Sequence, residues 1–108
     1  MRQNDQRSES RVSLELPAQI MVGTQLVLNG TLKDLSLRSA FITMKSSVYM
    51  KLNDEVGFSI HRATGNQATL LHGWARISRI VVGEGLAIYF TSMDDASAAR
   101  LKKLLDNG

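Results

Sequence analysis

The chain has 108 residues, of which 44% are apolar and 21% are charged, so it is long enough for one domain with a single core and too short for two. Its formal net charge of +3 favours an anionic partner only weakly, and no run of lysines or arginines forms the basic stripe typical of proteins that bind DNA or RNA. The absence of cysteine excludes disulfides, zinc–thiolate sites and thiol nucleophiles.

The first six residues are polar and lack the apolar segment of a signal peptide. No later apolar run approaches the roughly 18 residues of a transmembrane helix. We therefore expect a soluble, cytoplasmic protein that is not inserted in a membrane. Its oligomeric state stays open at this point.

Two arginines, Arg7 and Arg11, stand directly before the most regular strand pattern in the chain. Over residues 12–22 every even position is apolar and the odd positions are mostly polar, which is the period of a half-buried strand. An extended segment places the two arginines within about 14 Å of each other, so both guanidinium groups could reach one bulky anionic ligand. The alternative is a solvated, frayed N-terminus.

Three further strands are predicted at residues 26–34, 40–44 and 55–61 from their alternating apolar positions. Pro17 cannot donate a backbone hydrogen bond, so we expect it at an edge or a bulge of the first strand. In the third strand Ala40, Ile42 and Met44 are expected on one face, and in the fourth the apolar residues Val56, Phe58 and Ile60 alternate.

The segment 68–82 is long for one strand, and Gly73 in its middle indicates a bulge or a barrel corner. A last strand is predicted at residues 86–90. Six strands with turns between them and one terminal helix predict an all-β domain, either a small antiparallel barrel or a sandwich.

The terminal helix is expected over about residues 93–106. Ser92 stands three residues ahead of Asp95, which is typical of a helix start, and Ala98, Leu101 and Leu105 follow at helical spacing.

The sequence offers little for catalysis or metal binding. His61 and His72 have no second histidine or carboxylate at metal-ligand spacing, so each is predicted to be a strand-surface or satisfied core residue. No nucleophile elbow and no phosphate-binding glycine loop is present. We expect a binding domain and not an enzyme, without catalytic residues, metal or cofactor.

A second polar group lies between the second and third strands. Asp34 and Ser36 are two residues apart, so an extended segment places them on one face, with Leu35 and Leu37 on the other. A carboxylate accepts hydrogen bonds from the imino and amino edge of guanine, and a hydroxyl donates to phosphate. The alternative is an Asx- or Ser-turn that merely joins two strands.

Together, Arg7-x-x-x-Arg11 and Asp34-x-Ser36-x-x-Ser39 resemble the RxxxR and (D/N)xSxxG motifs of the PilZ domain, a bacterial six-stranded barrel that binds cyclic di-GMP. Residues 53–56, 73–76 and 85–90 look like further strands of that family, so the resemblance covers nearly the whole chain. It implies a six-stranded antiparallel β-barrel with a C-terminal helix, cyclic di-GMP as the ligand, and ligand binding by Arg7, Arg11, Asp34, Ser36 and Ser39.

One position departs from the family pattern, because Ser39 stands where the family has glycine. If that position needs positive φ or close approach of the backbone to the ligand, a Cβ costs about 1 kcal/mol or more. Alternatively, the serine hydroxyl contacts the ligand. Gln6 precedes the first motif arginine where two-molecule binders of the family have arginine, which favours one ligand molecule per domain.

Two hypotheses follow from the resemblance. In the first, a flexible arm of residues 1–11 closes over cyclic di-GMP on a barrel of residues 12–108 and so alters the surface that a downstream protein partner binds. In the second, the chain is a PilZ-like interaction module that binds no ligand.

Overall fold

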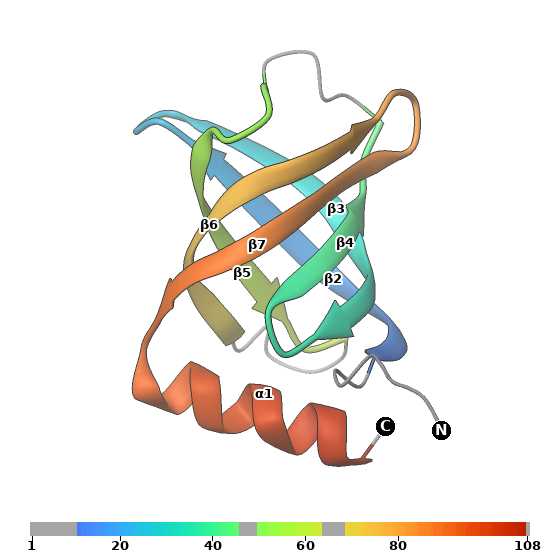
Figure 1. Cartoon of the computed structure of the whole chain (residues 1–108), viewed down its shortest axis with the longest axis vertical. Coiled ribbons are helices and arrows are strands. Elements are labelled where there is room, and N and C mark those ends of the chain that lie inside the picture. Colours follow the sequence, from blue (N-terminus) through green and yellow to red (C-terminus); the bar gives the residue numbers. More distant parts are fainter. Residues whose placement is uncertain (1–10, 46–49, 64–68, 108) are drawn as a thin grey trace, which may run out of the picture.

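The computed structural model describes residues 11–45, 50–63 and 69–107. Six antiparallel strands close into one barrel in the order β2-β3-β4-β7-β6-β5, and one helix follows them (Figure 1). The elements are β2 (Arg11–Val22), β3 (Leu26–Ser36), β4 (Ser39–Thr43), β5 (Glu55–His61), β6 (Thr69–Val81), β7 (Gly85–Met93) and α1 (Asp95–Asn107). The predicted six-stranded antiparallel barrel with a C-terminal helix is confirmed.

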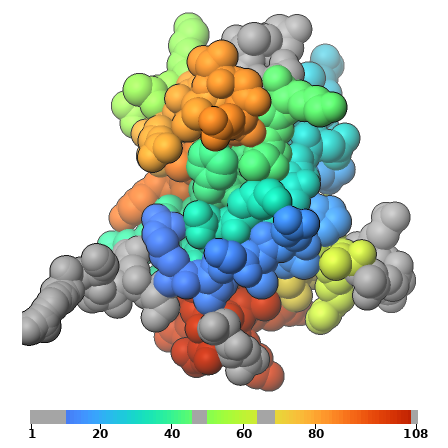
Figure 2. Space-filling model, turned by 90° about the vertical axis from the view of Figure 1, so that its right-hand side faces the viewer, coloured from blue at the N-terminus to red at the C-terminus, as the bar shows by residue number. Residues whose placement is uncertain are grey.

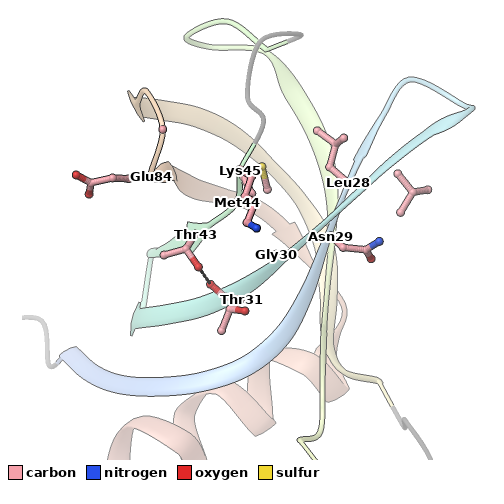
Figure 3. Close-up of a pocket in the computed structure, with 10 residues that line it drawn as sticks. Leu28, Asn29, Gly30, Thr31, Thr43, Met44, Lys45 and Glu84 are labelled. Carbon is pink, nitrogen blue, oxygen red and sulfur yellow. Dashed lines mark hydrogen bonds between the residues drawn. The ribbon is translucent and has the colours of Figure 1, made fainter.

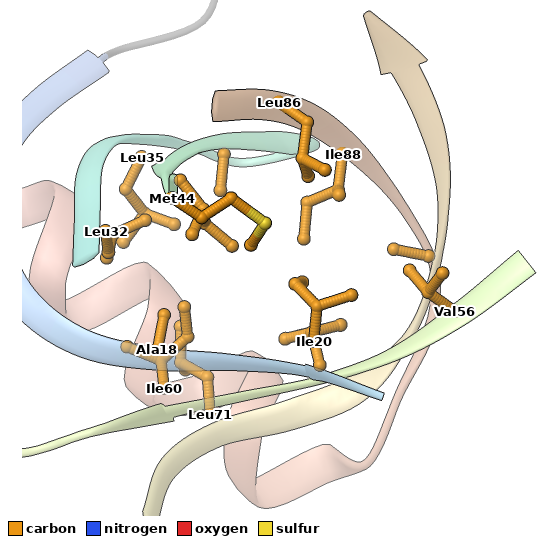
Figure 4. Close-up of a cluster of buried hydrophobic side chains, with 14 of the residues drawn as sticks. Ala18, Ile20, Leu32, Leu35, Met44, Val56, Ile60, Leu71, Leu86 and Ile88 are labelled. Atoms are coloured by element: carbon orange, nitrogen blue, oxygen red, sulfur yellow. The ribbon is translucent and has the colours of Figure 1, made fainter. Parts of the chain in front are cut away.

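Alternate side chains of all six strands meet inside the barrel and form its core (Figure 4). Phe58 is fully buried and packs against the ring of Phe90 at a centroid distance of 5.0 Å. Burying one such side chain contributes about 1.5–3 kcal/mol. The alternation predicted for the strands at residues 40–44 and 55–61 is confirmed, since the buried residues include Ala40, Ile42, Met44, Val56, Phe58 and Ile60.

Strand β2 contains a bulge beside its proline. The register between β2 and β3 shifts between Ser13 and Leu16, so β2 has one residue more than β3 over this interval. Pro17 follows directly, and the pairing of β2 with β5 begins only at Ala18. Proline fits here because this part of β2 has a paired neighbour on one side only. The predicted position at an edge or a bulge is confirmed.

Gly73 allows β6 and β7 to approach closely. A Cβ on Gly73 would lie 2.2 Å from the carbonyl oxygen of Ser92, so no larger residue fits without a shift of the backbone. The register between the two strands shifts directly afterwards, between Trp74 and Ala75. The bulge predicted from this glycine is therefore confirmed.

Helix α1 lies below one end of the barrel and packs against β6 and β2 (Figure 1). Leu101 on its inner face is 3% exposed. With 13 residues, this helix is the only one in the described part of the chain, and it is neither long nor apolar enough to cross a membrane.

Three side chains, His72, Asp94 and Ser97, tie the start of α1 to β6, and we call them the helix clasp. The Ser97 amide donates to Asp94 Oδ1 at 2.7 Å, so Asp94 caps the helix. The Ser97 hydroxyl accepts from the His72 amide at 3.1 Å, and His72 Nε2 lies 2.9 Å from Asp94 Oδ2. The prediction that Ser92 starts the helix is wrong, because Ser92 is paired with Trp74 inside the sheet.

Candidate ligand-binding site

The turn between β3 and β4 is closed by the side chain of Ser36. Its hydroxyl accepts hydrogen bonds from the amides of Ser39 at 3.2 Å and Arg38 at 3.4 Å, and it lies 3.0 Å from the Ser39 hydroxyl. Ser36 is fully buried. The Ser-turn foreseen as an alternative is therefore present, and this hydroxyl holds the turn in place.

The predicted alternation of faces ends at this turn. Leu35 is fully buried, as expected for a side chain facing the core, but Leu37 is 44% exposed. The expectation that both leucines share one face is wrong, because the strand ends at Ser36 and the chain reverses there. Asp34 remains on the strand, is half-buried, and stands opposite Ser13 on β2 and Phe41 on β4.

Arg11 is the first residue of β2, so the barrel includes the residue that was expected to end the arm. It stands opposite Ser36, and its guanidinium Nη2 donates to the Ser39 hydroxyl at 3.5 Å across 28 residues of sequence. The start of β2 (blue) lies between helix α1 (red) and the strands β3 and β4 (cyan to green) in Figure 2. Arg7 falls outside the described residues.

Ser39 has the ordinary backbone of a strand. It belongs to β4 and stands opposite Tyr89 on β7. Among the described non-glycine residues only Asn53 has positive φ, at 71°. The possibility that Ser39 occupies a left-handed conformation is therefore wrong, whereas close approach of the backbone to the ligand and a contact of the hydroxyl with the ligand both remain predictions.

Sequence reasoning missed a second arginine contact beside Ser39. The Arg38 guanidinium Nη1 donates to the Tyr89 hydroxyl at 3.4 Å, and the Arg38 carbonyl accepts from the Phe90 amide at 2.8 Å. Tyr89 is 44% exposed. The nearness of these side chains depends on the β4–β7 register, which no local pattern specifies.

The family model of the PilZ domain matches residues 5–107. The chain belongs to the PilZ domain family. PilZ domains are binding domains, and the family is one of cyclic di-GMP receptors. No curated protein matches the sequence.

Solved structures share the fold of this PilZ domain at low sequence identity. The Bacillus subtilis inhibitor of motility MotI/DgrA has a TM-score of 0.77 and 10% identity over 95% of this chain, which spans 50% of that protein. The PilZ domain of YcgR from Escherichia coli, solved with c-di-GMP, has a TM-score of 0.75 and 14% identity over 95% of this chain and 91% of its own. The PilZ domain of CeSA from a cellulose-synthesizing bacterium has a TM-score of 0.60 and 21% identity, over 90% and 95% of the two chains.

Proposed function

We propose that this PilZ domain is a cytoplasmic receptor for cyclic di-GMP that binds one ligand molecule between the arginine segment and the β3–β4 turn. The observation that carries the proposal is the contact between Arg11 and Ser39, which are 28 residues apart in sequence. The first belongs to the RxxxR motif and the second to the DxSxxS segment. Two motifs of different strands thus meet, and the half-buried Asp34 lies on β3 two residues before Ser36, which pairs with Arg11.

Each described motif residue has a distinct role in the proposal. The Arg11 fork donates paired hydrogen bonds to a phosphate or to O6 and N7 of guanine. Asp34 accepts from the imino and amino edge of guanine, and the Ser39 hydroxyl adds one contact. Ser36 positions the turn from beneath, because it is fully buried and its hydroxyl is already bonded within the protein.

The switching step uses Arg7 together with Arg11. Because Arg11 is the first residue of β2, the arm that carries Arg7 is attached to the barrel directly beside the proposed ligand. A ligand phosphate between the two arginines offsets their mutual repulsion and brings the arm onto the barrel. The surface so formed is then available to a downstream protein partner.

The test is calorimetric titration of the full chain with cyclic di-GMP, with GTP and GMP as control nucleotides. We expect saturable binding with a stoichiometry of one for cyclic di-GMP and much weaker binding of both controls. Arg79→Ala serves as the matched arginine control, because Arg79 is exposed and lies on β6, which pairs with none of the strands β2, β3 and β4 that carry the motif residues. Equal affinity for all three nucleotides would contradict the proposal.

The second candidate function is an interaction module that binds no ligand. It is favoured by Ser39 at the family's glycine position, since the Ser39 hydroxyl engages Arg11 within the protein. This function predicts no binding heat with cyclic di-GMP for the parent or for Ser39→Gly while both remain folded.

A further inference from the structure

Strand β3 extends beyond its pairing with β4 in the described part of the chain. Strand β3 has 11 residues and β4 has 5, and their pairing begins where Thr31 stands opposite Thr43. The preceding segment of β3, Leu26–Gly30, pairs with β2 on one side. On its other side no strand of the described chain pairs with it, so among the described residues one edge of this segment is open as far as Gly30, where Thr43 approaches closely.

A hollow of about 700 Å³ lies along this open edge (Figure 3). Its far wall is formed by the end of β4 and the β6–β7 turn, where the Met44 amide donates to the Glu84 carbonyl oxygen at 2.9 Å. The Thr43 hydroxyl donates to the Thr31 carbonyl oxygen at 3.3 Å and joins β3 to β4 where the hollow ends. The hollow is thus bounded by a strand edge on one side and a closed wall on the other.

The size of the hollow matches one short strand. At about 3.3 Å per residue, 4.8 Å between strands and 10 Å between packed faces, five residues of added strand take up roughly 800 Å³. A second copy could reach this edge only with a strand edge of its own barrel, because the shortest principal extent of the molecule is 22 Å and a whole barrel does not enter the hollow. A single extended segment therefore fits better than a second copy.

The chemistry of the edge also favours a polypeptide. An unpaired strand edge presents backbone N–H and C=O groups, and natural edges are commonly protected by lysine or proline. The segment Leu26–Gly30 has neither residue, and Leu26 and Val27 are 36% and 48% exposed. Lys45 and Glu84 at the rim have opposite charges, which favours an uncharged segment over an acidic or basic one.

We propose that Leu26–Gly30 binds an extended, uncharged segment of a partner protein by strand addition, with apolar side chains of that segment at alternate positions. Backbone hydrogen bonds supply the affinity, and the contacts with Val27 and Leu28 select apolar side chains. This peptide edge lies at the beginning of β3, whereas the candidate ligand site lies at its end. The proposal therefore stands without ligand binding.

The test is a selection of phage-displayed random peptides of about seven residues on the full chain without nucleotide. We expect selected peptides with apolar residues at alternate positions, and we expect each synthetic peptide to slow amide hydrogen exchange over residues 26–30. Val27→Lys places a charge on the edge and should weaken binding by at least about tenfold, as should Asn29→Lys. Leu52→Lys is the matched control, because Leu52 is 59% exposed and does not line the hollow, and it should bind as the parent does.

Melting temperatures of all three variants establish that each remains folded. The proposal is overturned if no peptide is enriched, if bound peptides leave exchange over residues 26–30 unchanged, or if Val27→Lys and Asn29→Lys bind as tightly as the parent. It is also overturned if the same segment is protected by dimerisation of the chain, measured as a doubled mass in solution.

Discussion

The candidate ligand site and the helix clasp both join segments that are distant in sequence, but their hydrogen bonds differ in length and exposure. The helix clasp has two hydrogen bonds made by the fully buried Ser97, at 2.7 and 3.1 Å, and a third contact of 2.9 Å between the side chains of His72 and Asp94, which are 56% and 47% exposed. At the candidate site, Arg11 contacts Ser39 at 3.5 Å and is exposed. Short bonds around a buried group hold the fold, whereas a long contact of an exposed fork leaves most of its donors for a ligand.

Ser36 shows that one motif can contain both kinds of residue. Its hydroxyl is fully buried and makes contacts of 3.0 to 3.4 Å within the turn, so it resembles Ser97 more than its motif neighbours. The comparison therefore divides the motif into a residue that builds the turn and residues that face outward. Mutations at the two places should change different measured quantities.

The largest expected effect is on affinity at the arginines. Each charge-assisted hydrogen bond is worth roughly 1.5–3 kcal/mol, so Arg11→Ala and Arg7→Ala should each weaken cyclic di-GMP binding on the order of tenfold to a hundredfold. Calorimetry measures the affinity, and the melting temperature of the free protein should barely change. Arg79→Ala should affect neither quantity. If Arg11→Ala unfolds the protein, this arginine is structural, and the proposed difference between the candidate ligand site and the helix clasp does not hold.

The opposite result is expected in the helix clasp. Ser97→Ala leaves the His72 amide without its acceptor, which should lower the free energy of unfolding by about 1–3 kcal/mol. Chemical denaturation measures this loss, and affinity for cyclic di-GMP should stay within twofold of the parent. Ser78→Ala is the matched control, because the Ser78 hydroxyl is exposed and donates to a backbone carbonyl, and its effect should be much smaller. A large loss of affinity in Ser97→Ala would mean that the clasp belongs to the site.

A smaller effect is expected at Ser39. Because its backbone is not left-handed, Ser39→Gly should relieve no φ strain and should not stabilise the free protein. If the hydroxyl contacts the ligand, Ser39→Gly and Ser39→Ala should both weaken binding by about 0.5–1.5 kcal/mol. Tighter binding by the glycine variant in the same titration would instead indicate crowding of the ligand by the side chain.

The smallest effect is a pH dependence of stability from the helix clasp. The hydrogen bond from the Ser97 amide lowers the pKa of Asp94 from its ordinary value of 3.8. The unfolded chain therefore takes up this proton at higher pH than the folded chain does. The stabilisation by the carboxylate is fully present above pH 3.8 and is lost as the pH falls through the lowered pKa of the folded protein.

Denaturation curves measured between neutral pH and acid test this dependence. Below pH 3.8, the ordinary pKa of this carboxyl group, the parent should lose stability more steeply than Asp94→Asn, which has no carboxylate to protonate. Asp95→Asn, one residue along the same helix, is the matched control and should follow the parent. Identical slopes for the parent and Asp94→Asn would show that the cap does not depend on this charge.

The fold was predictable because its strands are half-buried. Apolar side chains at every second position identify the inner face of a strand whatever its neighbours are, and Val56, Phe58 and Ile60 are all buried as the pattern indicates. Glycine and proline added local information, since Gly73 and Pro17 both lie beside bulges. The choice of a barrel over a sandwich came from the family resemblance and not from the pattern.

The site was predictable only in part. The motif residues Arg11 and Ser39 do meet, but the burial of Ser36 and the contact of Arg38 with Tyr89 follow from a turn and a strand register that the sequence does not state. Asp94 caps the helix in place of Ser92 because β7 extends further than its apolar pattern indicates. Local patterns specify faces, whereas contacts between strands depend on the whole barrel.

The most direct test of the account is amide hydrogen exchange over the full chain with and without saturating cyclic di-GMP. The account predicts slower exchange in residues 1–11 and in the turn from Ser36 to Ser39, with no change at the helix clasp beyond that caused by overall stabilisation. Exchange that is unchanged at the arm and the turn under saturation, or slowed chiefly at the helix clasp, would contradict it.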